Sequence, residues 1–362
     1  MTKKIGILGT RGIPNQYGGF EQWATQLSVT LAKRGYDVSV YNSHFHPYQK
    51  PEYKGVKIIR KWDPKSIGLA SQFIYDLLCV TDARKQNFDT IIQLGYTTSS
   101  VWAKLLPKSS QIIYNMDGME WKRKKYKGVL SKFLKHAEKL AVKHSNQLIA
   151  DSLPIKKYLE KKYHVQAAFI PYPADIFSNP DKTVLQPFNI QPDEYFLLIA
   201  RFQPDNNFET AIQGVIDSKS DKPLIIVGDD NNRYGRFLKK KYNNRQIIFA
   251  GKIYDKVVLD NLRYFSALYF HGHSAGGTNP SLLEAMAASC VICAHNNEFN
   301  KAVLGEDTYY FNNEKDITEI LNGKTNDFSN KQWISDNLNK LRENYTLDKI
   351  VDSYVRLIEH TK

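Results

Sequence analysis

Cysteine is scarce in this chain of 362 residues, which has only three, Cys79, Cys290 and Cys293. An odd number this small does not build a disulfide framework, so we expect a reducing, cytoplasmic environment. Long apolar runs are also missing. The apolar stretch near the N-terminus ends at Leu8, too short for a signal-peptide core, and no window approaches the ~20 apolar residues of a membrane-spanning helix. The sequence therefore predicts a soluble, cytoplasmic protein that lies at most on the inner face of the cell membrane.

Acidic residues are outnumbered in one half of the chain. The whole sequence has 50 Lys and Arg against 37 Asp and Glu, a net charge of +13. Residues 1–175 hold 28 basic and 13 acidic side chains, whereas residues 176–362 hold 22 and 24. A basic half suits an anionic membrane, an anionic substrate or a nucleic acid. A nucleic-acid-binding protein is the less favoured alternative, because we find no such motif and the basic residues are not interleaved with aromatic ones.

Short β-type runs alternate with helical periods along the chain, which predicts an α/β fold of parallel sheets covered by helices. The expected strands are 5–8, 38–41, 56–59, 90–94, 111–114, 147–150, 168–170, 195–200, 224–227, 246–249, 267–270 and 291–294. Residues 171–193 hold five prolines in 23 positions, so neither helix nor strand is expected there and we interpret them as a linker.

This pattern predicts two Rossmann-like, doubly wound domains, residues 1–175 and 176–345. A C-terminal helix over 346–362 is expected to cap the second domain or to pack back on the first. Ligands of such sheets bind outside the carboxyl ends of the strands. We therefore expect the two domains to face each other across a cleft that holds the active site.

A glycine-rich loop follows the first predicted strand, with the sequence GTRGIPNQYGGFE at residues 9–21. It is neither G-x-G-x-x-G nor G-x-x-x-x-G-K-[ST], which argues against a nicotinamide cofactor and against P-loop chemistry. Gly18 and Gly19 would let the backbone approach a phosphate or a sugar closely at the start of the next helix. The alternative is a turn-rich loop that binds no ligand.

Arg201 comes directly after the first predicted strand of the second domain, in the segment ARFQPDNNFE at residues 200–209. An arginine at the carboxyl end of a strand can make bidentate contacts to a diphosphate. The alternative is a surface arginine that pairs with Asp205 or Glu209.

The segment HGHSAGGTNPSLLEAM, residues 271–286, predicts a second anion site. Pro280 suits the first position of a helix, and the residue before it is a suitable N-cap. Glu284 lies about one turn inside that helix among apolar neighbours, where a buried carboxylate needs a partner such as a ligand hydroxyl. The alternative for Glu284 is a solvent-facing side chain. The residues expected to contact a diphosphate or a sugar are Gly276, Gly277, Thr278 and Asn279.

Together these segments resemble the retaining glycosyltransferases of family 4, which have the GT-B fold. More closely, GTRGIPNQYGGFE, NMDGMEWKRKKY, ARFQPDNNFE and GGTNPSLLEAM are similar to the bacterial rhamnosyltransferase-type branch, which builds surface polysaccharides. The resemblance implies an N-terminal acceptor-side domain and a C-terminal nucleotide-sugar donor domain. It implies transfer of L-rhamnose from dTDP-rhamnose to a saccharide acceptor carried by a polyprenyl diphosphate. A nucleotide-sugar epimerase of the same fold, which would need no acceptor, is the alternative.

The resemblance also implies roles for single residues. The glycine-rich loop would approach the donor diphosphate or sugar, Arg201 would bind the diphosphate, and Glu284 would hold the nucleotide ribose. Asn206 stands where most members have a lysine, and Gly276 where they have a glutamate. The missing glutamate fits a donor with different hydroxyls, such as a deoxysugar. Since the nucleotide sugar is a substrate, no cofactor is implied. No metal is expected either. His44 and His46, and likewise His271 and His273, are spaced as metal ligands might be, but each pair lacks a third ligand at fixed spacing.

Asp117 and Glu120, in the segment DGMEW after the strand at 111–114, are the expected catalytic residues. In the retaining mechanism attributed to this fold, an oxygen of the leaving phosphate takes the acceptor proton, so a side-chain base is optional. Asp117 would orient the acceptor or stabilise positive charge at the anomeric carbon. Its alternative is a turn-forming Asp-Gly pair, and the alternative for Glu120 is a solvated surface position.

A basic segment follows, since residues 122–143 hold nine basic side chains and one acidic side chain, Glu138. We expect an amphipathic helix there, with Val129 and Leu130 on its apolar stripe. Such a helix can lie on an anionic membrane. The alternative, which we favour for the stripe itself, is a core helix with a solvated lysine face. The residues expected to bind the membrane or the acceptor are Lys122, Arg123, Lys124 and Lys125.

Overall fold

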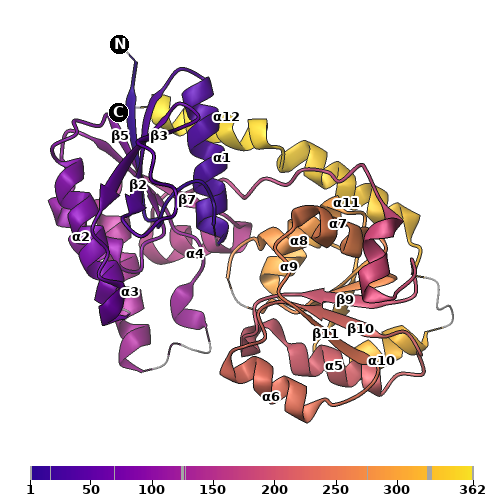
Figure 1. Ribbon diagram of the computed structural model, residues 1–362. Helices are drawn as coiled ribbons and strands as arrows, with labels where there is room; N and C mark the ends of the chain where they lie inside the picture. Colours follow the sequence, from indigo (N-terminus) through magenta and orange to yellow (C-terminus); the bar gives the residue numbers. More distant parts are fainter. Residues whose placement is uncertain are drawn as a thin grey trace. The chain divides into compact units, whose positions relative to one another are not determined.

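The computed structural model describes residues 2–16, 18–68, 70–123, 126, 128–274, 276–323 and 328–360. Unit 1 comprises Met1–Tyr172 and Asp348–Lys362, and unit 2 comprises Pro173–Leu347. Each unit is a largely parallel sheet covered by helices (Figure 1). The predicted α/β fold with two Rossmann-like domains is confirmed. In the ranges given above, no helix combines the length and the apolar character needed to cross a bilayer.

The strands of unit 1 are β1 (Lys4–Leu8), β2 (Asp37–Ser43), β3 (Glu52–Tyr53), β4 (Val56–Lys61), β5 (Thr90–Leu94), β6 (Gln111–Asn115), β7 (Gln147–Ala150) and β8 (Ala168–Phe169). Their order in the sheet is β3-β4-β2-β1-β5-β6-β7-β8. β3 and β4 pair antiparallel, and the other neighbours pair in parallel. β5 and β6 are buried at every position, as expected of parallel strands with helices on both faces.

The helices of unit 1 are α1 (Gly19–Lys33), α2 (Ala70–Ala83), α3 (Val129–His144), α4 (Leu153–Tyr163) and α12 (Leu347–Glu359), with 3-10 turns η1 (Lys65–Ile67), η2 (Ser99–Leu105) and η3 (Glu120–Lys122). α12, at the C-terminal end of the colour scale, lies beside α1 (Figure 1). Trp23 on α1 donates its Nε1–H to the Tyr354 hydroxyl on α12 at 3.2 Å. Lys3 Nζ donates to the Ile358 carbonyl at 2.8 Å. The C-terminal helix is therefore part of unit 1.

The strands of unit 2 are β9 (Phe196–Ile199), β10 (Leu224–Val227), β11 (Ile247–Gly251), β12 (Leu268–His271), β13 (Ile292–His295) and β14 (Tyr309–Phe311). They pair in parallel in the order β11-β10-β9-β12-β13-β14. β3 and β14 are strands that the sequence analysis did not predict. The core of the unit is apolar and aromatic, and it includes Phe196, Phe208, Ile226 and Phe270.

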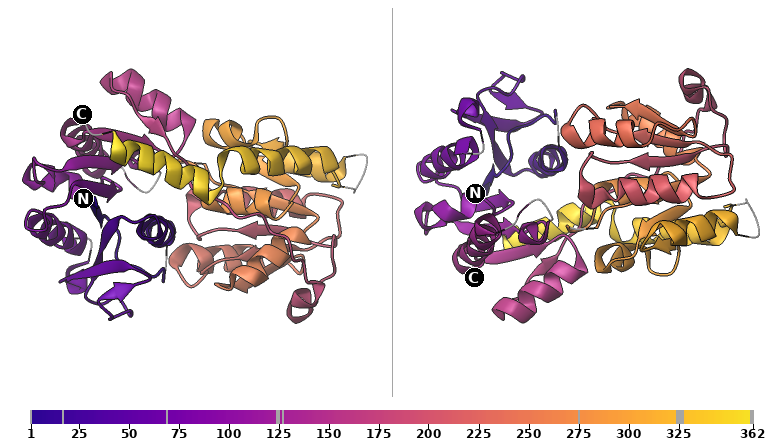
Figure 2. Two further views of the ribbon diagram at one scale, coloured as in Figure 1. Left: turned by 90° about the horizontal axis from the view of Figure 1, so that it is seen from above. Right: turned by 90° about the horizontal axis from the view of Figure 1, so that it is seen from below.

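The helices of unit 2 are α5 (Phe208–Ile216), α6 (Arg233–Lys241), α7 (Lys256–Tyr264), α8 (Pro280–Ala287), α9 (Glu298–Leu304), α10 (Glu314–Asn322) and α11 (Lys331–Asn344), with 3-10 turns η4 (Lys182–Phe188) and η5 (Pro204–Asn206). Helices cover both faces of the sheet, which is the doubly wound arrangement (Figure 2). This arrangement leaves the loops at the carboxyl ends of the strands as the natural ligand-binding edge.

The expected linker is folded rather than irregular over part of its length. Within residues 171–193, η4 contains Pro187 and is capped by Asp181, whose side chain accepts from the backbone N–H of Thr183 at 2.9 Å. Leu185 is buried, and the Asp181 backbone N–H donates to Asn261 on α7 at 2.6 Å. The cap and the buried leucine stabilise a turn that the prolines alone argued against.

Candidate functional site

The glycine-rich loop joins β1 to α1, and Gly18 is the N-cap residue of α1 with φ +115°. This conformation favours glycine, and a side chain at position 18 would meet the Glu21 carboxylate. Glu21 Oε1 also accepts from the backbone N–H of Arg11 at 3.2 Å. A carboxylate therefore already lies at the start of α1, where the free N–H groups of the helix gather. Like-charge repulsion makes Gly18 and Gly19 better suited to a sugar hydroxyl than to a diphosphate.

Arg11 lies at the centre of a polar network that the sequence analysis missed. Its Nη1 pairs with Asp63 Oδ2 at 2.8 Å, and its Nε donates to Gln72 Oε1 at 3.0 Å. Gln72 in turn donates to the buried Asp76 at 2.9 Å, and Thr98 Oγ1 donates to the same carboxylate at 2.5 Å. Burial raises the pKa of Asp76 to about 6, although these hydrogen bonds lower it. Arg11, Asp63 and Thr98 follow β1, β4 and β5, so the network lies at the carboxyl edge of unit 1.

Asp117 follows β6 in the left-handed region, with φ +45°, which is uncommon for a residue other than glycine and clusters at functional sites. Its backbone N–H donates to Asn115 Oδ1 at 3.0 Å, and the Tyr172 hydroxyl donates to its Oδ1 at 3.3 Å. Burial, followed by the Asp117 charge, raises the pKa of Tyr172 well above its ordinary value, so the hydroxyl remains a donor. Asn115 Nδ2 donates to Tyr354 at 3.3 Å, so α12 helps to hold this loop.

Glu120 and Arg123 form an ion pair, with Oε1 and Nε 2.7 Å apart and both side chains largely buried. Glu120 is therefore not the solvated side chain of the alternative interpretation, and its pairing with a guanidinium argues against a role as proton acceptor. Arg123 is not an exposed cation, which is a correction to its expected role in membrane contact. Lys122 is exposed. Lys124 and Lys125 lie outside the described residues.

Glu138, the acidic residue of the basic segment, is buried on α3. Its Oε1 accepts from the hydroxyls of Tyr158 and Tyr163, each at 2.7 Å, and from Lys162 Nζ at 2.8 Å. Its Oε2 accepts from Trp121 Nε1 at 2.9 Å. Burial, together with Glu138, raises the pKa of both tyrosines. The network ties α3 to α4 and holds the loop that follows β6.

The predicted apolar stripe of α3 is buried only in part. Leu134, Ala137 and Ala141 are buried, whereas Val129 is 84% exposed and Leu130 is 40% exposed. The expectation of a core helix therefore fails for the first turn of α3.

Arg201 follows β9 and is exposed at the carboxyl edge of unit 2. The alternative was a surface arginine that pairs with Asp205 or Glu209. Glu209 instead pairs with Lys241 at 2.6 Å, and within the described ranges no carboxylate forms an ion pair with Arg201. Its guanidinium is therefore available for an anionic ligand.

Asn206 is buried, and its side chain forms hydrogen bonds to two loops. Its Nδ2 donates to the Arg201 carbonyl at 2.7 Å, and its Oδ1 lies 3.1 Å from His273 Nδ1. The backbone N–H of Ser274 donates to the Asp205 carbonyl at 3.0 Å. Because β9 and β12 are neighbours in the sheet, these bonds hold the Arg201 loop beside the loop that leads into α8.

α8 begins at Pro280, as predicted, with Asn279 as its N-cap. The Asn279 side chain accepts from a backbone N–H of the first turn at 2.9 Å. Gly276 has φ +134°, so a glutamate at this position would be strained. Thr278 is buried and Gly277 is half-buried. The four expected contact residues thus form the turn that precedes the N-terminus of α8.

Glu284 has a protein partner that the sequence analysis missed. Arg263 on α7 is fully buried, and its Nη2 lies 2.5 Å from Glu284 Oε2, while its Nη1 pairs with Asp260 at 3.1 Å. Burial alone would lower the pKa of Arg263, but the Glu284 and Asp260 charges raise it above its ordinary value. The side chain of Glu284 remains 27% exposed. The spacing of Asp260 and Arg263, three residues apart on a predicted helix, was an available signal that these two side chains form an ion pair.

The paired histidines have structural contacts. His44 Nδ1 accepts from the Asp63 backbone N–H at 2.9 Å, and His46 Nε2 lies 3.1 Å from the Pro14 carbonyl. Burial lowers the pKa of His271 well below its ordinary value, so its ring is neutral. Across the described ranges, no group of three or more His, Cys, Asp or Glu side chains could hold a metal ion.

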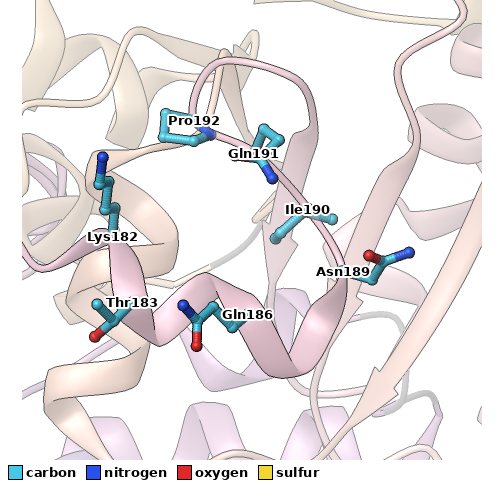
Figure 3. Close-up of a pocket in the computed structure, with 7 residues that line it drawn as sticks. All are labelled: Lys182, Thr183, Gln186, Asn189, Ile190, Gln191 and Pro192. Carbon is cyan, nitrogen blue, oxygen red and sulfur yellow. The ribbon is translucent and has the colours of Figure 1, made fainter.

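A pocket in unit 2 lies along η4 and the residues after it (Figure 3). It is lined by Lys182, Thr183, Gln186, Asn189, Ile190, Gln191 and Pro192. It is not built from loops at the carboxyl ends of strands, and it contains no predicted site residue. We therefore place the candidate donor site at Arg201 and α8 and not in this pocket.

Comparisons with known proteins report on the fold and on the kind of protein that the chain is similar to. Residues 182–347 match the family model described as Glycosyl transferases group 1. This part of the chain is similar to the domain of group 1 glycosyltransferases. The matched range contains Arg201, the turn into α8 and Glu284. Residues 2–175 match a model described as a domain of unknown function, DUF1972. A search of curated proteins finds no match.

Solved structures share the fold over nearly the whole chain. Sucrose-phosphate synthase from Thermosynechococcus elongatus gives a TM-score of 0.80 at 15% identity, covering 98% of each chain. Anabaena Alr3699/HepE in complex with UDP and glucose gives 0.76 at 13% identity, covering 100% of each chain. Trehalose 6-phosphate synthase from Burkholderia multivorans gives 0.69 at 12% identity, covering 99% of this chain and 96% of the other. At these identities the likeness shows the fold, which is that of GT-B glycosyltransferases.

Proposed function

We propose that this chain is a retaining glycosyltransferase of family 4, in the rhamnosyltransferase-type branch. It transfers L-rhamnose from dTDP-rhamnose to a saccharide acceptor, carried by a polyprenyl diphosphate, in surface polysaccharide synthesis. The observation that carries the proposal is the group 1 glycosyltransferase match over residues 182–347, combined with an exposed Arg201 held beside the turn into α8. A similar structure, Anabaena HepE, binds UDP-glucose, which supports a nucleotide-sugar donor.

The donor side of the reaction is assigned to unit 2. Arg201 binds the diphosphate, and the backbone N–H groups at the start of α8 add positive potential without a metal ion. Residues Gly276, Gly277, Thr278 and Asn279 face the diphosphate or the sugar. Glu284 accepts hydrogen bonds from the ribose hydroxyls, and its pairing with Arg263 keeps the carboxylate in one orientation. No cofactor is required, because the nucleotide sugar is itself a substrate.

The acceptor side of the reaction is assigned to unit 1. In the transfer, the bond between the anomeric carbon and the diphosphate oxygen breaks, and a bond from that carbon to the acceptor oxygen forms on the same face. The acceptor proton passes to an oxygen of the leaving diphosphate. Asp117 orients the acceptor hydroxyl or stabilises the positive charge that develops at the anomeric carbon. Gly18 and Gly19 approach the donor sugar. Glu120 acts only through its ion pair with Arg123.

A deoxysugar donor is supported by the residue at position 276. Most family members carry a glutamate there that contacts sugar hydroxyls, whereas this chain has a glycine in a conformation that a glutamate adopts only with strain. A Gly276→Glu variant would therefore confound a change of donor preference with a change of backbone. The direct comparison is between dTDP-rhamnose and dTDP-glucose with the unaltered protein, in which we expect tighter binding of dTDP-rhamnose.

We also propose that the protein works in the cytoplasm at the inner face of the cell membrane, where a lipid-linked acceptor is found. Lys122 is the residue of the expected basic contact that is described and exposed. An anionic bilayer attracts such cations within a Debye length of its surface.

The proposal is tested by a thermal-shift panel of UDP-, dTDP- and GDP-sugars, followed by a transfer assay with the donor that binds. A ligand that binds only the native state raises the apparent melting temperature. Stabilisation by dTDP-rhamnose and acceptor-dependent release of dTDP would support the proposal. Conversion of the donor without any acceptor would favour the epimerase, and no stabilisation by any nucleotide sugar would overturn the glycosyltransferase assignment.

A further inference from the structure

Large apolar side chains are exposed along one edge of unit 1. In the described ranges of this unit they are Phe45, Trp62, Ile67, Val129, Leu130 and Leu153. Phe45 follows β2, and Trp62 and Ile67 follow β4. The others begin α3 and α4, the helices that come after β6 and β7. In a parallel sheet all these positions belong to the carboxyl edge, which is also the ligand-binding edge.

Five of these side chains lie on segments that are in direct contact. We call Phe45, Trp62, Ile67, Val129 and Leu130 the apolar rim. The His44 backbone N–H donates to the Lys61 carbonyl at 2.9 Å, so the loops after β2 and β4 are adjacent. Phe73 in the first turn of α2 packs on Phe133 near the start of α3, with ring centroids 5.6 Å apart. Because η1 leads into α2 and the two helices lie side by side (Figure 1), the rim extends from β2 to α3.

Exposed lysines lie on the same segments as the apolar rim, while three nearby carboxylates are buried or nearly buried in ion pairs. The exposed lysines include Lys65, Lys122, Lys132 and Lys135. The ammonium group of Lys65 lies 4.8 Å from the centroid of the Phe45 ring. Asp63 and Glu138 are buried, and Glu120 is nearly so, each paired with a cation. This edge therefore presents apolar and positively charged side chains together, and these three carboxylates are already paired with cations.

We propose that the apolar rim is the surface by which unit 1 lies on an anionic bilayer. An exposed tryptophan and phenylalanine beside lysines suit the boundary between headgroups and acyl chains, where aromatic rings are half-buried and ammonium groups meet phosphates. The basic segment alone would provide only the electrostatic part of this contact. The inference extends the proposed function, since Asp117 also follows a strand at this edge and would lie near a lipid-linked acceptor.

The test is cosedimentation of the full chain with vesicles of equal parts phosphatidylglycerol and phosphatidylcholine, at physiological salt. The rim variant carries Phe45→Ser and Trp62→Ser. Its matched control carries Tyr254→Ser and Val257→Ser, two apolar side chains of unit 2 that are at least as exposed, at 65% and 59% against 52% and 57%. We expect the rim variant to bind roughly tenfold more weakly than the wild type, and the control to bind as the wild type does. Vesicles of phosphatidylcholine alone should bind the wild type weakly.

A second readout is the fluorescence of Trp62, which should shift to shorter wavelength on vesicle binding and should not do so in Trp62→Phe. The proposal is overturned if the wild type does not bind the anionic vesicles, or if the rim variant and the control bind alike. It is also overturned if the rim variant loses self-association in the absence of lipid, which would make the rim an interface between copies of this chain. Stabilisation by nucleotide sugars, measured on the same variants, reports separately on the proposed reaction.

Discussion

Unit 1 and unit 2 share an architecture of a largely parallel sheet covered by helices, and they differ in the side chains at their carboxyl edges. In unit 2 an arginine, Arg201, is exposed without a carboxylate partner among the described residues, and the acidic Glu284 is held by a buried guanidinium. In unit 1 the arginines Arg11 and Arg123 are the paired groups, held by Asp63 and Glu120. The fold is thus shared, and the loops at the strand ends decide which side chains are exposed to a ligand.

The net charge of +13 is distributed differently in the two units. Unit 2 is near neutral and concentrates its positive potential at Arg201 and the start of α8. Unit 1 spreads its excess of lysines over a surface that also carries the apolar rim. The first pattern suits a small anionic donor, and the second suits an extended anionic surface.

The largest effect is expected at the buried ion pair of unit 2. Arg263→Met leaves the Glu284 carboxylate without its partner, which should lower the free energy of unfolding by about 3–5 kcal/mol. Adding Glu284→Gln removes the unpaired charge and should restore part of that loss. Urea unfolding of the single and double variants checks this, and equal stability of the two would contradict it.

The exposed arginine of unit 2 comes next. Arg201→Ala should lower turnover by roughly 10²–10³-fold, because it removes a positioned cation from the leaving diphosphate. Arg245→Ala, which changes an exposed arginine just before β11 at the opposite edge of the sheet, is the matched control and should leave turnover unchanged. Steady-state kinetics with dTDP-rhamnose compares them. Equal turnover in both variants would show that the Arg201 guanidinium does not contribute to the reaction.

A smaller kinetic effect is expected in unit 1. Asp117→Asn keeps a side chain that can still accept from Tyr172, so the loop should hold its shape, while turnover should fall by roughly 10²-fold. The affinity for dTDP, measured by calorimetry, should not change, because we propose that the donor binds to unit 2. Normal turnover would remove Asp117 from the acceptor side, and a loss of dTDP affinity would contradict the division between the units.

The smallest effect concerns the buried network around Arg11. Since burial raises the pKa of Asp76 to about 6, the folded state binds a proton that the unfolded state has released, and this favours folding at low pH. As pH rises the group must ionise in a buried place, so it destabilises the fold increasingly. Asp76→Asn should therefore gain about 1 kcal/mol relative to the wild type between pH 5 and pH 7. Unfolding measured at both pH values checks this, and a difference independent of pH would argue against a titrating Asp76.

Much of the fold could be predicted from the sequence, because parallel strands that are covered on both faces are continuous apolar runs. β5, β7 and β10 have the predicted bounds. β14 is only three residues long, Tyr309–Phe311, and carries no such signal. The 3-10 turn η4 was missed because the high proline content of this segment argues against a helix. The turn is stabilised instead by the Asp181 cap and by burial of Leu185, which the proline count does not reveal.

The candidate site was predictable where one loop or one helix start defines it. Asn279 is a favourable N-cap and Pro280 a favourable first helical residue, so the sequence predicts the start of α8, and the structure confirms it. Arg263 was missed because its contact with Glu284 depends on how α7 packs on α8. Likewise, the contact of Asn115 with Tyr354 joins residues 239 positions apart, and no local pattern predicts such a pair.

The most direct test of the assignment of the donor to unit 2 is backbone hydrogen exchange of the full chain with and without dTDP-rhamnose. We predict slower exchange in peptides that cover residues 200–209 and 276–287, and no such protection at residues 182–192. Protection confined to unit 1, or none anywhere under conditions in which dTDP-rhamnose is bound, would contradict the placement of the donor at Arg201 and the start of α8.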